Sequence, residues 1–162
     1  MFLVLYVCSI GLSIVEKKGV PAVNGALGGG LMVATIVWCL GSISGAHLNP
    51  AVTVSFLVTG KINPLATILY VGFQLLGAIT GSFILNGLVP DFAKSNLSMT
   101  TVHEKLDLTQ AFGVEFIITF ILVLTVFSCV DEDRKDLHGS FPLSIGIAII
   151  IGSLFGGPLT GK

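Results

Sequence analysis

The chain has 162 residues, of which 53% are hydrophobic and only 10% are charged, and its formal net charge is −1. Soluble domains carry about 25% charged residues, so this composition, with a mean hydropathy of +0.97, indicates an integral membrane protein. The near-zero net charge gives no reason to expect a nucleic-acid partner. Cys8, Cys39 and Cys129 lie far apart in apolar runs, which predicts buried reduced thiols and neither a disulfide nor a metal site.

Two apolar runs open the chain. Residues 2–15 would extend about 21 Å as a helix, less than the ~30 Å of a bilayer core, so we interpret them as the end of a first spanning helix whose start is missing. A signal peptide would need basic residues before the run and a small-residue cleavage site after it, and neither is present. Residues 24–43 form the second predicted span, in which Gly25 and Gly29 allow close helix packing.

Residues 44–54, Ser-Gly-Ala-His-Leu-Asn-Pro-Ala-Val-Thr-Val, interrupt the apolar pattern. Asn49 is a good N-cap, and Pro50 fits the first helical position, where no N–H is needed. A helix from there to Thr59, closed by Gly60, would be about 15 Å long, half of the bilayer core. Non-helical backbone at membrane depth is tolerated only where it lines a cavity or is buried in protein. The pattern therefore predicts a re-entrant half-helix, preceded by extended backbone, beside a path through the membrane.

Three more spans follow in the sequence. A second Asn-Pro pair, at Asn63, starts a helix over residues 65–89, and residues 108–130 form the next span. The last helix opens at residue 141 and is expected to end near Gly156. The predicted fold class is an all-α membrane protein, a single domain of five transmembrane helices and one re-entrant half-helix.

Residues 44–52 resemble the first Asn-Pro-Ala box of the aquaporins, or major intrinsic proteins, and the resemblance extends over nearly the whole chain. Members of this family consist of two inverted repeats, each with three spanning helices and a half-helix. The resemblance implies a first repeat at about residues 1–89 and a partial second repeat at about 108–162. It places the second box, the filter arginine and the sixth helix beyond Lys162, so we expect an incomplete channel, from a partial sequence or a truncated isoform.

The resemblance assigns the pore motif to Asn49, Pro50 and Ala51. The side-chain amide of the Asn is expected to donate hydrogen bonds to a passing water or hydroxyl group. The positive end of the half-helix dipole points to the same place and repels cations, protons included. A simple helix cap without a role in a pore is the alternative for Asn49.

Other roles follow from the same resemblance. The carbonyl oxygens of Gly45, Ala46 and His47 are expected to form a ladder of acceptors, while the imidazole of His47 is interpreted as a satisfied buried side chain. Glu115 is interpreted as a brace for the second pore loop, and without that loop its carboxyl is expected to be unpaired or protonated. Asn96 begins the only Asn-x-Ser/Thr sequon, in a loop that the family topology places outside, and is a candidate glycosylation site.

Two positions of the family's narrowest point fall within this chain, at Gly29 and Ser153. Water-selective members usually have Phe and His there. Small residues at both positions imply a wider constriction, because selectivity in such pores follows diameter and lining donors. We therefore expect glycerol or urea to pass as well as water.

The predicted function is a passive channel for water and small uncharged solutes, embedded in the lipid bilayer of the plasma membrane and homotetrameric when complete. The sequence contains no nucleophile–base pair, metal cluster or nucleotide-binding loop, so neither an enzyme nor a cofactor is expected. The alternative is a non-conducting membrane protein, either a structural component or a truncated subunit that associates with full-length channels. A proton-coupled transporter would need more intramembrane ionisable groups than Glu115 and His47.

Overall fold

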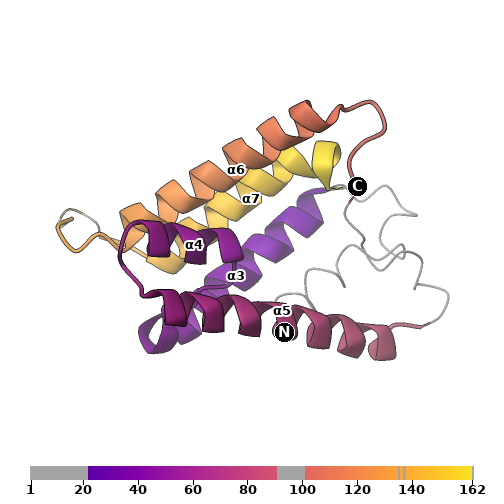
Figure 1. The fold of residues 1–162 in the computed structure, drawn as a ribbon. Coiled ribbons are helices and arrows are strands. Elements are labelled where there is room, and N and C mark those ends of the chain that lie inside the picture. Colours follow the sequence, from indigo (N-terminus) through magenta and orange to yellow (C-terminus); the bar gives the residue numbers. More distant parts are fainter. Residues whose placement is uncertain (1–21, 91–100, 135, 137, 162) are drawn as a thin grey trace.

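The computed structural model describes residues 22–90, 101–134, 136 and 138–161, and this part of the chain is helical without a β-strand (Figure 1). In chain order the helices are α3 (Ala22–Ser44), α4 (Pro50–Val58), α5 (Pro64–Leu88), α6 (Leu108–Cys129) and α7 (Phe141–Thr160). All but α4 are long and apolar enough to cross a membrane. The predicted all-α membrane fold is confirmed in this part, whereas the first predicted span, residues 2–15, and Asn96 lie outside the described residues.

Four of the helices begin at a residue whose side-chain oxygen accepts a hydrogen bond from the first turn. These residues are Asn49, Asn63, Asp107 and Ser140. Proline follows in the first turn of α4, α5 and α7, where a missing N–H costs nothing. The two Asn-Pro pairs therefore predicted the starts of α4 and α5 within one residue.

Helix α7 is longer than the sequence predicts. The expected end near Gly156 is wrong, because the helix continues to Thr160 with Pro158 inside it. Although proline removes one backbone donor, the last turn keeps a backbone hydrogen bond: Gly161 N donates to Gly157 O at 3.0 Å, and Thr160 Oγ1 lies 3.2 Å from Gly156 O. Membrane helices tolerate proline where neighbouring groups, threonine hydroxyls among them, bond the backbone around it.

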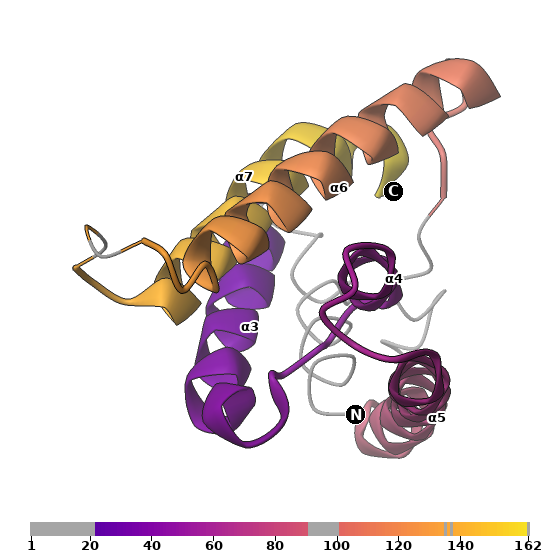
Figure 2. The same cartoon turned by 60° about the vertical axis from the view of Figure 1, so that its left-hand side comes forward.

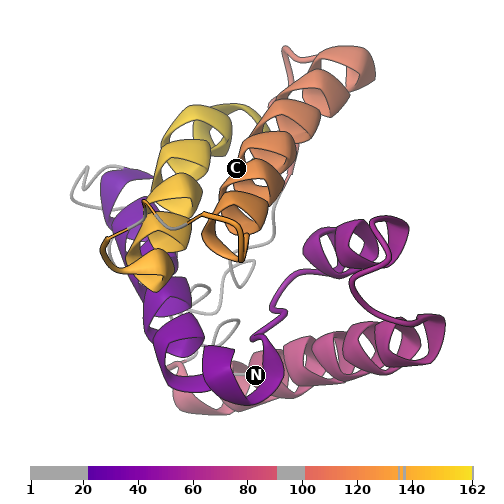
Figure 3. The ribbon, with the colours of Figure 1, turned by 90° about the vertical axis from the view of Figure 1, so that its left-hand side faces the viewer.

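The helices form two groups. Helix α7 packs against both α3 and α6, and Figure 2 shows these three together on one side of the molecule. Helix α4 contacts α5 and α6, and a tight turn joins α4 to α5, so that the two form a hairpin (Figure 3). The segment that leads from α3 to α4 crosses between the groups (Figure 3).

Gly30 and Gly146 meet where α3 crosses α7. A Cβ atom on Gly30 would lie 2.4 Å from the carbonyl oxygen of Gly146, and one on Gly146 would lie 2.6 Å from the carbonyl oxygen of Gly30 and 2.8 Å from Cβ of Ala34. The two backbones are therefore in direct contact, as small residues allow between membrane helices. The close packing predicted at Gly25 is wrong for the part of the chain that the structure describes, because a Cβ on Gly25 would meet nothing there within 4 Å.

Most large apolar side chains face outward. A small core joins α3, α4, α6 and α7 through Val33, Val52, Val126 and Ile145. Many other large apolar residues are exposed on the chain taken alone, as the outer surface of a membrane protein requires. Cys129 is a half-buried free thiol, but the burial predicted for Cys39 is wrong, since this free thiol is exposed on α3.

Candidate pore site

The segment before the half-helix begins with a left-handed turn. Gly45 has φ +71 and Ala46 has φ +47, and Gly45 N donates to Gly41 O at 2.9 Å. A left-handed glycine after a helix is a common cap, whereas a left-handed alanine costs about 1–2 kcal/mol. The extended backbone predicted for this segment is wrong for these two residues, although Asn49, with φ −133 and ψ 128, is extended. The chain therefore turns sharply out of α3 and enters α4 through Asn49.

Asn49 caps α4 and faces a cavity. Its Oδ1 accepts a hydrogen bond from Ala51 N at 2.8 Å, while its Nδ2 has no partner among residues 22–90, 101–134, 136 and 138–161. Pro50 occupies the first helical position, and the half-helix is nine residues long, about 14 Å. The two amide N–H groups of Asn49 are therefore unpaired within the described residues and lie at the positive end of the helix dipole, beside the cavity.

The cavity beside the half-helix has a volume of about 740 Å³ and is bounded by α3, α4, α6 and α7. On α3 its lining residues recur every four positions from Gly25 to Gly41, a length of about 24 Å along the helix, most of the thickness of a bilayer core. The cavity brings together predicted pore residues that are far apart in the sequence: Gly29, Gly45, Ala46, His47, Asn49 and Ser153.

The two predicted filter residues lie toward the same end of this cavity. Helices α3 and α7 run in opposite directions (Figure 3) and cross at Gly30 and Gly146. The residues that precede Gly30 in α3 therefore lie beside the residues that follow Gly146 in α7. Gly29 comes from the first of these and Ser153 from the second, and both line the cavity. Because Gly30 contacts α7 directly, the structure separates it from its neighbour Gly29, which faces the cavity.

The carbonyl of His47 has a partner that the sequence did not reveal. Nε2 of Gln74, on α5, donates to His47 O at 2.5 Å and to Thr53 Oγ1 at 2.9 Å. A carbonyl oxygen has two lone pairs, so this rung of the predicted ladder keeps at most one for a solute. The signal that could have revealed Gln74 is its position, an amide near the middle of a helix long enough to span a membrane.

The imidazole of His47 is held by aromatic rings. Its centroid lies 4.6 Å from that of Phe56, edge to face, and 4.8 Å from that of Tyr70, stacked. Its Nδ1 is buried and has no hydrogen-bond partner in the described part of the chain. The prediction of a satisfied histidine is therefore wrong for this nitrogen, because aromatic neighbours surround the ring where a polar one was expected.

Glu115 lies on α6, apart from the cavity lining. Its carboxylate accepts a hydrogen bond from Thr160 Oγ1, which ties α6 to the last turn of α7. Of the two states predicted for this carboxyl, unpaired or protonated, the unpaired one is wrong, because α7 continues far enough to bring Thr160 to it; the protonated one stays a prediction. The bracing of a second pore loop by Glu115 stays a prediction.

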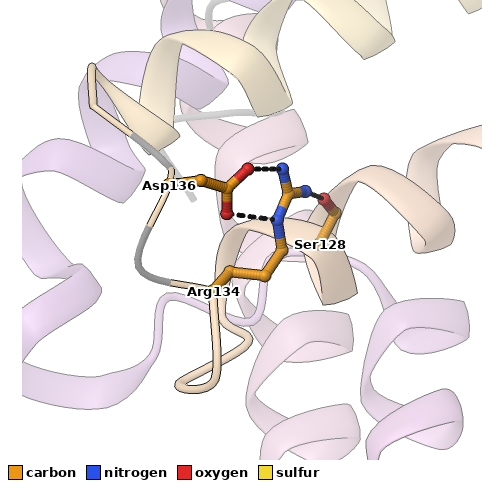
Figure 4. Close-up of polar contacts among 3 residues, drawn as sticks. All are labelled: Ser128, Arg134 and Asp136. Atoms are coloured by element: carbon orange, nitrogen blue, oxygen red, sulfur yellow. Dashed lines mark hydrogen bonds and ion pairs between the residues drawn. The ribbon is translucent and has the colours of Figure 1, made fainter.

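The loop between α6 and α7 contains an exposed ion pair (Figure 4). Arg134 donates from Nε and Nη2 to the Asp136 carboxylate at 3.3 and 3.0 Å, and from Nη1 to Ser128 Oγ at the end of α6. The hydrogen bonds from Arg134 lower the pKa of the Asp136 carboxyl below its ordinary value, and those to Asp136 raise the pKa of Arg134. Neither Arg134 nor Asp136 lines the cavity.

Comparison with known proteins places this geometry in a family. The family model described as "Major intrinsic protein" matches residues 1–162. The chain is 42% identical over 136 residues to the lens fiber major intrinsic protein of Lithobates pipiens, covering 84% of this chain and 52% of the relative. It is 46% identical over 132 residues to aquaporin-4 of Bos taurus, covering 82% and 41%. The chain thus spans about half, or less, of the length of these relatives.

A solved structure shares the fold. The X-ray structure of the aquaglyceroporin from Plasmodium falciparum matches with a TM-score of 0.78 and 30% sequence identity. The match covers 88% of this chain and 62% of that one. The arrangement of the described helices is therefore that of a known type of membrane protein.

Proposed function

Because the chain belongs to the major intrinsic protein family, we propose that it forms part of a passive membrane channel for water and small uncharged solutes. One observation carries this proposal: Asn49 caps a half-length helix and lines a cavity that follows α3. Members of the family are channels and not enzymes, and the four apolar helices fit a multi-pass membrane protein.

The cavity wall is mostly apolar and offers water only a few hydrogen-bonding groups. Apolar side chains such as Val33, Val52 and Ile145 line much of the wall and offer no hydrogen bond. A water molecule therefore meets its strongest partners at the free amide of Asn49 and at the backbone turn before it. The same amide and the dipole of α4 orient water with its oxygen toward the half-helix and repel a cation.

The small residues at Gly29 and Ser153 support passage of a three-carbon polyol or urea. Gly29 is buried without a side chain, and Ser153 is half-buried with only a hydroxymethyl group. Both line the same end of the cavity, so neither narrows it in the way a Phe or His would. We include glycerol and urea among the solutes for this reason.

The surroundings proposed for this channel are the bilayer and further copies of the same subunit. Large apolar residues on α5 and α6 are strongly exposed on the chain taken alone, for example Phe73 at 71% and Phe112 at 70%. Exposed apolar area of this extent calls for lipid or a neighbouring subunit against it. A homotetramer in the plasma membrane fits this surface and the family, and remains a proposal.

The test is solute uptake by oocytes that express the full-length protein, unmutated or with Ser153→His. We expect water, glycerol and urea uptake above that of uninjected cells, and a larger loss of glycerol than of water flow in S153H, because the imidazole narrows the cavity at Ser153. Ser144→His is the matched control, since Ser144 lies on α7 but outside the cavity lining.

Each result has a separate meaning. Surface-expressed protein without water flow would contradict the channel proposal and favour a non-conducting membrane protein. Water flow without glycerol or urea uptake would leave the channel proposal standing and contradict the argument from Gly29 and Ser153.

A further inference from the structure

We propose that Tyr70 and Gln74 are positioning residues that fix residues 44–49, which we name the pore segment, from α5, and we name this pair of side chains the α5 clamp. The proposal rests on the proposed channel function, because it explains how the backbone that faces the cavity is held. It concerns side chains that touch the pore segment from behind, away from the path of the solute.

The clamp grips the backbone at two points. Tyr70 and Gln74 are four residues apart and so lie on one face of α5. Tyr70 Oη donates to Ser44 O, and Gln74 Nε2 donates to His47 O at 2.5 Å. The two carbonyls stand on either side of the left-handed turn, so the clamp holds both ends of the strained piece of backbone.

A second hydrogen bond from Gln74 reaches the half-helix itself. Nε2 donates to Thr53 Oγ1 at 2.9 Å, and this hydroxyl donates to Asn49 O at 3.1 Å. Thr53 is 0% exposed, so this relay is shielded from solvent. A hydroxyl can accept and donate at once, and the relay therefore links the Gln74 amide to the residue that caps α4.

The orientation of the Gln74 amide follows from these partners. Turning it by half a turn would place Oε1 against the carbonyl oxygen of His47, two acceptors facing each other. In the observed orientation Oε1 is buried and has no partner within the described residues. A buried Oε1 without a partner costs free energy. The two hydrogen bonds that Nε2 donates, to His47 O and Thr53 Oγ1, offset this cost and explain a polar side chain at this position.

Aromatic packing adds to the clamp. The Tyr70 ring stacks on the His47 imidazole at a centroid distance of 4.8 Å, so the same residue holds the segment through its ring and through its hydroxyl. Packing alone does not orient a peptide group, whereas a hydrogen bond to its carbonyl does. We therefore expect the amide of Gln74 to set the direction of the backbone near Asn49.

The first experiment compares Gln74→Leu with Thr80→Leu in the full-length protein reconstituted in liposomes. Loss of a hydrogen bond to a buried acceptor changes the equilibrium between the held and the released backbone roughly fivefold. We therefore expect water permeability per channel to fall about fivefold or more in Q74L. Within the described residues the Thr80 hydroxyl donates to Leu76 O of its own helix and to no other helix, so T80L should match the unmutated protein. Equal permeability of Q74L and T80L would overturn the positioning role.

Gln74→Glu gives a readout that a purely structural role would not move. When protonated, the introduced carboxyl has one donor and can restore the bond to His47 O, whereas the carboxylate places negative charge against that oxygen. Permeability of Q74E should therefore rise as the pH falls through the pKa of the introduced carboxyl, while the unmutated protein changes less over the same range. A Q74E permeability as insensitive to pH as that of the unmutated protein would contradict the proposal.

Hydrogen–deuterium exchange tests the clamp independently of conduction. In Q74L the backbone amides of residues 45–49 should exchange about fivefold faster, as loss of one stabilising hydrogen bond predicts, with no such change in T80L. Unchanged exchange in Q74L would overturn the clamp, whether or not the protein conducts. If the unmutated protein conducts no water, the proposed channel function fails, and the exchange rates still decide whether the clamp exists.

Discussion

The two helix contacts that frame the cavity are made in opposite ways. Where α3 crosses α7, the backbones of Gly30 and Gly146 are in direct contact. Where α5 meets the pore segment, side chains reach across the gap, and Tyr70 and Gln74 donate hydrogen bonds to backbone carbonyls. The contact between α3 and α7 depends on the absence of side chains, whereas the contact made by α5 depends on the polar side chains of Tyr70 and Gln74.

The difference reflects what each contact has to hold. Lipid gives apolar helices no hydrophobic reason to associate, so close packing of small residues joins α3 to α7. The backbone before α4 is not helical and cannot satisfy its own carbonyls, and at membrane depth an unpaired polar group costs several kcal/mol. Packing thus builds the frame, and hydrogen bonds orient the irregular segment within it.

The largest expected effect comes from breaking the packed contact. Gly146→Ala puts a Cβ 2.6 Å from the carbonyl oxygen of Gly30, so the helices must separate, and we expect a loss of about 3 kcal/mol, the upper end of what overpacking costs. Gly157→Ala is the control on the same helix, because a Cβ there meets nothing within 4 Å. Titration of each variant with a denaturing detergent, in micelles of a mild one, measures its free energy of unfolding. Equal free energies for G146A and G157A would show that the two helices are not in tight contact at the crossing.

A smaller effect is expected from a polar contact between packed helices. Thr160→Val removes the hydroxyl that donates to Glu115, which should lower the free energy of unfolding by about 1–2 kcal/mol. Thr125→Val is the matched change on α6, where the hydroxyl donates to Ile121 O of its own helix and to no other helix among the described residues. The same titration compares them, and a T160V protein as stable as T125V would mean that the Glu115 contact contributes nothing.

The smallest effect is expected from the polar contact that faces water. Arg134→Ala should leave the thermal midpoint unchanged at neutral pH, because exposed ion pairs contribute little. The pKa of Asp136 is lowered by Arg134, so any stabilisation from the pair is present at neutral pH and is lost as the pH falls through that lowered pKa. A clear drop in the midpoint of R134A at neutral pH would show that this loop supports the helices.

The sequence predicted the regular elements well, because local signals mark them. Asn49 and Asn63, each followed by proline, determined two helix starts, and the length of the apolar runs predicted the described spans. The resemblance to the family selected the residues that line the cavity, Gly29 and Ser153 among them. Capping residues and hydropathy are properties of a short stretch of chain, so they can be recognised in the sequence without a structure.

Contacts between distant residues were not predictable in this way. The bond from Gln74 to His47 joins positions 27 residues apart, and no local pattern indicates which carbonyl an intramembrane amide will meet. The left-handed Ala46 was missed because alanine has no preference for that conformation. The partner of Glu115 was missed because the last helix was expected to end near Gly156, before Thr160.

The central claim is that Asn49 serves the cavity as well as capping its helix, and Asn49→Asp compared with Asn63→Asp tests it most directly. Both asparagines cap a helix that continues with proline, and aspartate is an equally good cap. The two differ in that Asn49 is half-buried and lines the cavity, whereas Asn63 is exposed and does not line it. In proteoliposomes of the full-length protein, N49D should slow osmotic water flow and increase cation leak, because a carboxylate replaces a donor at the helix start, while N63D should change neither. Unchanged water flow and cation exclusion in N49D, or equal changes in N63D, would contradict the account.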